Sequence, residues 1–585
     1  MKIFTRFMNM AMLLIFSASL VAQTTYYVSS DGDDDNDGLT EETALATLYQ
    51  AIAKDVGLAD SGDVVMVTGT VLNAPDSLEI DGAWDYFENG YTVNKILTIE
   101  GTGDDATVDV KARSVWSGVY CFGAPFIVRN LTFTNSVPDV EISKSIFKLQ
   151  TTYAAADISF ENCNFIDLPS KGSGGVMNIF GHNVNIDKCL FTGCTGNQGG
   201  VIFVDGNLNV GGSDGITSSY KTTINISSSA FINNTSKHHG GAICATTGYQ
   251  VIRNEYSPID INIINTTFYG NASERDPGKG GGNGGALFFT GEFPIKDVSP
   301  SEELSDVTMT NVTVVGNTNR KGPGESGGIK FGNTRSGIYE LNNCLIYGNM
   351  VLQEDPETGD QNPITVDFNG SDLIESDEPT EHFEIIMKNS IVGVAYAGYD
   401  DDNGVAENPN LTSVDAEFGI YNKVEGYTAT IDTIEFILDS LDANGIVMFN
   451  DEQLPYDFGL LSHLGSITVD QIGNTRGNLP FGAASVGAWE YNEADLGIGG
   501  NSVEKDLMGI DNLIVYPNPV TESSMIKVPG QKKANVNIYS ITGAIVKSML
   551  VDESVSFPAN EIGKGLYILE LKTETNTYLQ KILLR

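Results

Sequence analysis

Apolar and polar residues alternate over short segments that recur along most of the chain. In seven copies the alternating stretch leads into a four-residue step that ends on a large apolar residue, here called the anchor. The seven steps are Asn130–Phe133, Asn162–Phe165, Lys188–Phe191, Ser228–Phe231, Asn265–Phe268, Asn311–Val314 and Asn343–Ile346, with a weaker eighth copy at Asn389–Ile391. A period of two that is rich in β-branched and aromatic residues predicts half-buried strands.

Two further features recur with the anchors. Four consecutive copies carry asparagine three residues after the anchor, at Asn234, Asn271, Asn317 and Asn349. Five copies continue into a Gly-Gly pair and a short apolar run, at positions 174–175, 199–200, 240–241, 284–285 and 327–328. Successive anchors lie 26 to 46 residues apart. Such variation excludes helical heptads and is typical of a solenoid whose turns keep their strands and vary their loops.

Stacked turns place like residues above like residues. We therefore expect Phe to stack on Phe inside the solenoid, and each Asn amide to bond the next along a bend. The Gly-Gly pairs would supply the positive φ angles of a sharp bend. Because an open strand edge invites pairing with other chains, the first turn needs a cap. Residues 23–70 fit that role, with a strand and turn at 26–32 and a short helix at 45–53.

The N-terminus has the pattern of a secretory signal peptide over residues 1–22. Lys2 and Arg6 precede an apolar run from Phe7 to Phe16, and cleavage is expected after Ala22. The run is shorter than the ~20 residues that a membrane span needs. No later segment is long and apolar enough to predict a transmembrane helix.

Several motifs resemble known β-helix proteins. The run from Tyr26 to Ala53 and the following Ser61–Val67 resemble the opening of pectin-lyase-fold proteins. Phe231 to Asn234 with Gly240–Ile243, and the matching motifs of the next copy, resemble the FxxN and GGA(I/L) repeats of polymorphic outer membrane proteins. Asn474–Gly477 and Val486–Tyr491 resemble the closing turn of choice-of-anchor β-helix proteins. These resemblances imply a right-handed parallel β-helix over residues 23–492 and leave its activity open.

Four motifs near the C-terminus resemble a type IX secretion sorting domain. They are Val515–Pro519, Val536–Gly543, Gly563–Ile568 and Lys581–Arg585. The resemblance implies a small β-sandwich at 513–585, after a linker at 493–512. It also implies the type IX machinery as a partner, and passage through the periplasm to the outer surface or surroundings of a Gram-negative bacterium. The expected chain is therefore all-β: a pectin-lyase-like solenoid followed by a β-sandwich.

The composition of the chain argues against several classes of binding partner. The 585 residues carry a net charge of −43, which argues against nucleic acid or an anionic membrane as a partner. Six cysteines stand at positions 121, 163, 189, 194, 244 and 344, without the spacing of a disulfide framework. We expect them to be small buried apolar residues. Only five histidines are present, and none lies at zinc-ligand spacing with cysteine.

One acidic turn is a candidate calcium site. Asp31, Asp33, Asp35 and Asp37 stand at alternate positions and are followed by Gly38, a pattern that can wrap a Ca²⁺ ion. A full twelve-residue loop would need glutamate at position 44, where the chain has Ala44. The alternative is an acidic turn of the cap that binds no ion.

Basic residues recur in the loops between the anchors and the Gly-Gly pairs. They are Lys171, Lys237, His238, His239, Arg275, Lys279, Arg320 and Lys321. Since turns of a β-helix stack at ~4.8 Å, these residues would form a basic strip able to hold an acidic glycan or another host or cell-surface ligand. Lys237 or His239 could then act as the general base of a β-elimination. The alternative is a set of solvated loop charges.

Two classes of function therefore stay open. The favoured one is a secreted or cell-surface protein that is adhesin-like or glycan-binding. The alternative is a carbohydrate-active enzyme, a polysaccharide lyase rather than a glycoside hydrolase. No pair of carboxylates stands out from the 76 acidic residues, so the sequence nominates no hydrolase site.

Overall fold

The computed structural model divides the chain into two compact units at Asn492 and Glu493. In the first unit it describes residues 23–53, 57–75, 95–111, 116–118, 125–142, 144–150, 155–205, 221–246, 249–250, 255–256, 258–274, 282–290, 305–320, 326–332, 336–354, 361–365, 367–369, 382–388, 390–392, 395–396, 413–414, 459–460, 467–476, 483–484 and 487–488. In the second it describes residues 515–516, 525–527, 533–540, 545–552, 554–558, 561–562, 565–572 and 577–584. The predicted signal peptide, the linker and Cys121 lie outside these ranges.

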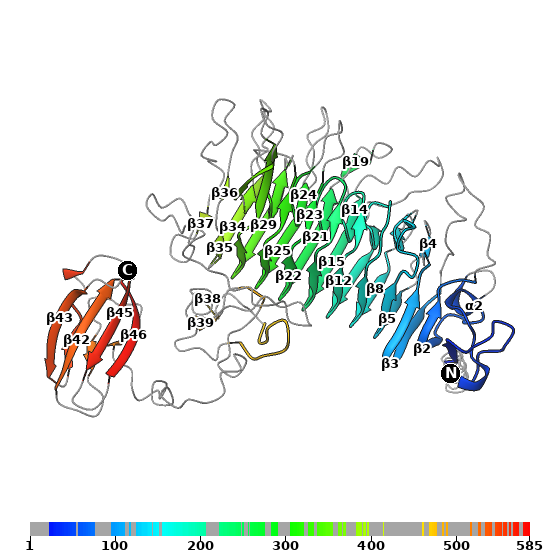
Figure 1. Cartoon of the computed structure of the whole chain (residues 1–585), viewed down its shortest axis with the longest axis horizontal. Helices are drawn as coiled ribbons and strands as arrows, with labels where there is room; N and C mark the ends of the chain where they lie inside the picture. Colours follow the sequence, from blue (N-terminus) through cyan, green and yellow to red (C-terminus); the bar gives the residue numbers. More distant parts are fainter. Residues whose placement is uncertain are drawn as a thin grey trace, which may run out of the picture. The chain divides into compact units, whose positions relative to one another are not determined.

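The first unit is a parallel β-helix, as the repeats predicted (Figure 1). Its largest sheet has 20 strands. They are β1 (Thr25–Ser29), β2 (Val64–Leu72), β3 (Leu97–Asp109), β5 (Phe126–Arg129), β6 (Thr132–Thr134), β8 (Asp157–Glu161), β9 (Asn164–Ile166), β11 (Asn183–Asp187), β12 (Leu190–Thr192), β15 (Thr222–Ser227), β16 (Ala230–Ile232), β21 (Ile259–Ile264), β22 (Thr267–Tyr269), β25 (Asp306–Thr310), β26 (Thr313–Val315), β29 (Ser336–Asn342), β30 (Leu345–Tyr347), β34 (His382–Lys388), β35 (Ile391–Val392) and β37 (Ser413–Val414).

Two smaller sheets form the other faces of the later turns. The nine-stranded sheet contains β4 (Trp116–Gly118), β7 (Phe147–Gln150), β10 (Met177–Phe180), β14 (Ile202–Asp205), β18 (Ile243–Thr246), β24 (Leu287–Thr290), β28 (Ile329–Gly332), β33 (Phe368–Asn369) and β36 (Ala395–Tyr396). The six-stranded sheet contains β13 (Thr195–Gly196), β17 (Thr235–Ser236), β23 (Ala272–Ser273), β27 (Thr318–Asn319), β31 (Met350–Glu354) and β32 (Gln361–Thr365). One turn runs β11, β12, β13 and β14, and β15 then pairs in parallel with β11.

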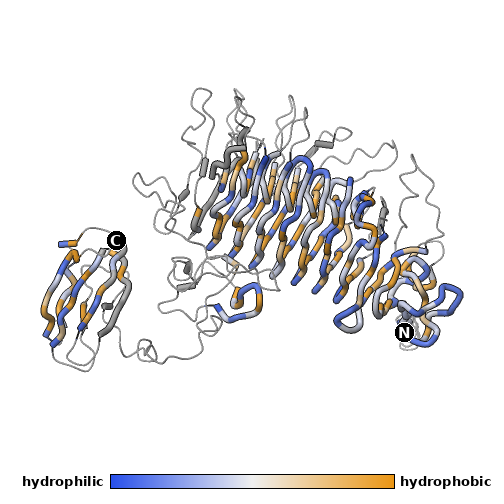
Figure 2. The backbone as a smooth tube through the Cα atoms, in the orientation of Figure 1, coloured by the Kyte–Doolittle hydropathy of each residue, from blue (hydrophilic) through white to orange (hydrophobic). Residues whose placement is uncertain are grey.

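The anchors form one aromatic column inside the solenoid. Rings of neighbouring anchors from Phe133 to Phe268 lie with centroids 5.1, 4.7, 4.6 and 4.8 Å apart. Val314 continues the column, because it is the register partner of Phe268. Figure 2 shows the alternation of apolar and polar residues along the strands that this packing requires. The predicted stacking of Phe on Phe is confirmed.

The first residue of each repeated step makes a bend within the large sheet. These residues, here called the bend row, have φ between 48° and 57°. They are Asn130, Asn162, Lys188, Ser228, Asn265, Asn311 and Asn343. Asparagine adopts this left-handed conformation more readily than most residues. The sequence indicated positive φ only at glycines, so the left-handed conformation of these first residues was not predicted.

A second asparagine row lies inside the next bend and is here called the buried Asn ladder. It comprises Asn234, Asn271, Asn317 and Asn349, each with 0% of its surface exposed. Each amide nitrogen donates to the amide oxygen of the next member, at 2.9, 2.9 and 2.8 Å. Each also donates to the carbonyl of the anchor one turn earlier. The ladder ends on the buried carboxylate of Asp367, 2.8 Å from the Asn349 amide nitrogen. The predicted amide stacking is confirmed.

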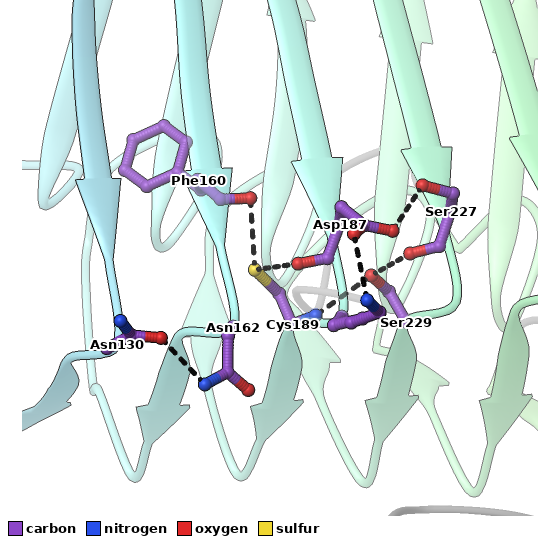
Figure 3. Close-up of polar contacts among 8 residues, drawn as sticks. Asn130, Phe160, Asn162, Asp187, Cys189, Ser227 and Ser229 are labelled. Carbon is purple, nitrogen blue, oxygen red and sulfur yellow. Dashed lines mark hydrogen bonds and ion pairs between the residues drawn. The ribbon is translucent and has the colours of Figure 1, made fainter. Parts of the chain in front are cut away.

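The five cysteines that the structure describes are buried, as expected, and three of them, Cys163, Cys189 and Cys344, directly follow bend-row residues. The Cys189 thiol donates to the carbonyls of Phe160 and Asp187 at 3.4 Å each. Ser229, one turn later, accepts from the Cys189 backbone N–H and donates to the Ser227 carbonyl (Figure 3). Burial raises the pKa of Cys194 and of Cys344 to about 12, so these thiols stay protonated at neutral pH.

The N-terminal cap covers the first turn. Helix α2 (Leu48–Ile52) buries Leu48, Ala51 and Ile52, and the short helix η1 (Glu41–Thr43) precedes it. Thr47 caps α2, because its side chain accepts from the Gln50 backbone N–H. The apolar end of the core is thereby shielded from water.

Residues 467–476 and 487–488, here called the strap, lie on the outer face of the large sheet (gold in Figure 1). Arg476 is only 5% exposed and donates to Asn265 Oδ1 at 3.1 Å. Gly487 has a φ of +95°, and an added Cβ there would lie 2.5 Å from Thr313 Oγ1. These residues belong to the two motifs that resembled a closing turn. Their described residues bind the flank of the middle turns.

Two short antiparallel pairs lie outside the three main sheets. They are β19 (Tyr249–Gln250) with β20 (Glu255–Tyr256), and β38 (Gly459–Leu460) with β39 (Ala483–Ala484).

The second unit consists of two antiparallel sheets. One contains β40 (Val515–Tyr516), β41 (Met525–Lys527) and β44 (Ser554–Ser556); the other contains β42 (Lys533–Ser540), β43 (Ile545–Asp552), β45 (Gly565–Lys572) and β46 (Thr577–Leu584). Ile526 of the first sheet and Val536 and Leu569 of the second belong to one buried core. Two sheets that share a core are the sandwich expected from the sequence.

Phe231→Ala should lower the free energy of unfolding by roughly 3–5 kcal/mol, because it opens a cavity between two stacked rings. Equilibrium denaturation of the purified protein measures the loss. An unchanged transition midpoint would show that Phe231 is not part of a packed column.

Asn271→Ala should lower the free energy of unfolding about as much as Phe231→Ala does. It leaves the Asn234 amide and the Phe231 carbonyl buried without their partner, and each such group costs about 1–3 kcal/mol. Asn162→Gly is the matched control: Asn162 is exposed and glycine accepts its φ of 51°. Denaturation of both variants should show a large loss for the first and a small one for the second. Equal losses would contradict the distinction between the two asparagine rows.

His182 makes stability depend on pH. Burial lowers its pKa to about 4, although hydrogen bonding with the backbone of Gln150 and Ala156 opposes the shift. The unfolded chain, with an ordinary histidine pKa, therefore binds the proton first as pH falls. The contribution of His182 to stability is complete above about pH 6.5 and is lost toward pH 4.

His182→Asn keeps an acceptor for the Ala156 N–H and removes this titration. Between pH 7 and pH 4.5 the native protein should lose about 2–3 kcal/mol more stability than the variant does. Denaturation at the two pH values measures the difference. Parallel losses in both proteins would show that His182 titrates normally.

Candidate functional site

Three of the predicted basic residues lie in one column beside the six-stranded sheet. The column runs Lys171, Asn197, Lys237, Glu274 and Arg320 on successive turns. Backbone hydrogen bonds fix this register, such as those from Lys237 N to Gly196 O at 2.9 Å and from Arg320 N to Ser273 O at 3.1 Å. Arg275, Lys279 and Lys321 lie outside the described residues, so their position in the predicted strip stays a prediction.

Acidic side chains accompany these cations. Glu141 accepts from Lys237 at 3.0 Å and pairs with Lys171 at 3.3 Å, while Glu274 pairs with Arg320 at 2.8 Å. The hydrogen bond from Lys237 lowers the pKa of Glu141. In the described part of the strip, each of these three cations is therefore paired with a glutamate, and its role in binding stays a prediction. Because the Lys171 and Arg320 side chains are 61% and 54% exposed, each ion pair is worth little and is open to competition.

The two histidines of the predicted strip lie against an aromatic side chain and the backbone of neighbouring turns. The His239 ring stacks on Phe288 with centroids 4.9 Å apart, beside a small apolar cluster of Phe203, Cys244 and Phe288. The backbone carbonyl of His238 accepts from Gly282, and that of His239 from Gly199. Lys237 is paired with Glu141. The assignment of Lys237 or His239 as a general base stays a prediction.

The carboxylates of the acidic turn make local hydrogen bonds. Asp33 accepts from the Asp35 N–H at 3.0 Å. Asp37 accepts from Thr43 Oγ1 at 2.7 Å, and this bond lowers the pKa of Asp37. Asp34, which the sequence analysis overlooked, accepts from the backbone and side chain of Thr47. In the parts of the chain that the structure describes, no three His, Cys, Asp or Glu side chains are grouped to hold a metal. A Ca²⁺ ion at Asp31, Asp33, Asp35 and Asp37 stays a prediction.

Sequence reasoning missed a pocket on the outer face of the large sheet. It has a volume of about 360 Å³ and is lined by Glu100, Arg129, Asn130, Glu161, Asn162, Asp187 and Lys188. Strand register places four of the charged residues in one column, in the order Glu100, Arg129, Glu161 and Asp187. A signal was available, because Arg129, Glu161 and Asp187 each directly precede a bend-row residue.

Arg129 and Glu100 form the shortest ion pair of the pocket, with Nη2 and Oε2 2.6 Å apart. Asp187 accepts from Ser227 Oγ at 2.7 Å and lies 3.9 Å from Lys188 Nζ (Figure 3). The pocket combines carboxylates, amides and cations on adjacent turns. It can therefore offer both hydrogen-bond donors and hydrogen-bond acceptors to a polar ligand.

Comparison with known proteins matches two parts of the chain. The family model described as "Secretion system C-terminal sorting domain" matches residues 514–585. The model of the Chlamydia polymorphic membrane protein repeat matches residues 228–246, which include Phe231, Asn234 and the Gly240-Gly241 pair. No curated protein and no solved structure matches the chain.

These findings define the class of protein. It is a parallel β-helix with polymorphic-membrane-protein-like repeats, joined to a type IX sorting domain. It is exported by the type IX system to the cell surface or surroundings of a Gram-negative bacterium. The helices within the described ranges have three and five residues, and none of them could cross a bilayer.

Proposed function

We propose that the β-helix is an adhesin-like surface protein that binds an acidic polysaccharide along the column of Lys171, Lys237 and Arg320. The observation that carries this proposal is the geometry at Glu141. Two ammonium groups from different turns converge on its carboxylate, at 3.0 and 3.3 Å. A uronate or sulfate group of a glycan offers the same kind of oxygen acceptor to these cations.

The spacing of the column favours a polymer over a small anion. Lys171, Lys237 and Arg320 occupy every second turn, so they recur at about 10 Å for a rung spacing of ~4.8 Å. An extended glycan that carries an acidic group on every second sugar would meet one cation per repeat. Several weak contacts along one chain add up through effective concentration.

Glu141 and Glu274 set the strength of such binding. Exposed ion pairs contribute only about 0–1 kcal/mol each, so a polyanion can displace these carboxylates at small cost. Binding should weaken as salt rises, because exposed charges are screened beyond ~10 Å at 0.1 M ionic strength.

Replacing Lys171, Lys237 and Arg320 together by serine should abolish binding of labelled polygalacturonate, and Glu141→Gln should strengthen it, because it frees two cations. Fluorescence anisotropy at several salt concentrations measures both effects. Lys188→Ser is the matched control, since Lys188 is equally exposed but lies on another face. Thermal unfolding checks that each variant keeps its fold.

Undiminished binding by the triple variant, or weaker binding by Glu141→Gln, would contradict the proposed site. The same incubations separate binding from catalysis. Unsaturated products that absorb in the ultraviolet, formed by the native protein and lost in His239→Ala, would support the polysaccharide lyase instead.

A further inference from the structure

The strap shows what the bend row can bind. Asn265, a member of that row, donates from its amide to the Val469 carbonyl at 2.8 Å and accepts from Arg476 at 3.1 Å. Arg476 also donates to the carbonyls of Gly487 and Ala488, at 2.8 and 3.0 Å. The row thus recognises a backbone carbonyl and a guanidinium group at once.

Asp470 gives the strap its shape. Its carboxylate accepts from the backbone N–H groups of Ile472 and Asn474, at 3.0 and 2.8 Å. Val469 and Thr475 then form a bridge across the base of the turn. The strap therefore presents Arg476 from a compact loop rather than from an extended chain.

The bend row is covered over only part of its length. Asn265, Asn311 and Asn343 are 3%, 0% and 0% exposed, and the strap contacts the first and last of them. Asn130, Asn162 and Lys188 have the same backbone conformation and are exposed. The surface that binds the strap therefore continues, open, over the earlier turns.

The open part lines the pocket of about 360 Å³, together with the carboxylates of Glu100, Glu161 and Asp187. Arg129 pairs with Glu100, and Lys188 lies near Asp187. Glu161 forms no ion pair with any residue that the structure describes. It is exposed and directly precedes Asn162, whose amide donates to Asn130 Oδ1 at 2.9 Å.

We propose that this open part of the row is a docking site for an arginine-bearing loop of a partner protein, with a carboxylate added to the amide contacts that hold Arg476. The guanidinium would pair with the Glu161 carboxylate, and the row amides would bond the loop backbone. Arginine suits the site better than lysine, because its planar fork can reach a carboxylate and an amide oxygen together. This site differs in residues and in sign of charge from the proposed glycan column.

A synthetic peptide of residues 467–477, labelled with a fluorophore, serves as the probe because it contains the loop that Asn265 of the row holds in the structure. Added to the full-length protein, it should bind saturably, and Glu161→Gln should weaken binding at least tenfold. A peptide with Arg476→Gln should lose binding to a similar extent. Fluorescence anisotropy with peptide up to millimolar concentration measures these affinities.

Two controls decide where the peptide binds. Glu274→Gln removes a half-exposed carboxylate, paired with Arg320, from another face and should leave affinity unchanged. Thr267→Val removes a hydrogen bond between strand β22, beside the covered row, and Gln471 of the strap, and should also leave affinity unchanged. The proposal is overturned if no binding occurs, if Glu274→Gln weakens binding as much as Glu161→Gln, or if only Thr267→Val has an effect. The last result would mean that the peptide exchanges with the strap.

Discussion

Every feature of this β-helix depends on the hydrogen-bonded register between successive parallel strands. Once β11 pairs with β8 and β15 in register, each side-chain position repeats at ~4.8 Å along the axis. That repeat is short enough for rings to stack and for amides to bond one another. It therefore favours identical residues at equivalent positions. Many weak contacts between neighbouring turns then add up to a continuous column.

The register has opposite consequences inside and outside the solenoid. Inside, a polar group needs a partner of its own kind, and the buried Asn ladder supplies one at each step until Asp367 accepts the last amide. Outside, the same repeat brings like charges close together. Part of the pocket avoids this by alternating in sign, as Glu100, Arg129 and Glu161 do, although Asp187 then follows Glu161. The motifs that match the membrane-protein repeat, Phe231 and Asn234, are fully buried, so they specify the fold rather than a contact with a partner.

The sequence was sufficient to predict those parts of the fold that repeat. The Phe column and the buried Asn ladder follow patterns that are visible without a structure, because each copy supports the next. The sorting domain was predicted from four motifs in the order of its family. Single contacts were not predictable. Glu141 lies in a loop with no repeated counterpart, so nothing in the pattern paired it with Lys237, 96 positions further along the chain. The strap meets Asn265 across 204 positions, and its binding depends on a three-dimensional surface. The bend row was visible as Asn130, Asn162 and their equivalents, but its conformation was attributed to glycine alone.

The strap also has a mechanical consequence. Ala488 is bound at Thr313, in the middle turns, and the chain passes from there toward its C-terminus. A force that pulls on the C-terminal side of Ala488 therefore acts first on the few hydrogen bonds of the strap, before it reaches the strands of the turns beneath. The strap would detach and lengthen the tether while the register of the solenoid stays intact. The detachment of the strap thus absorbs tension that would otherwise unfold the β-helix turn by turn.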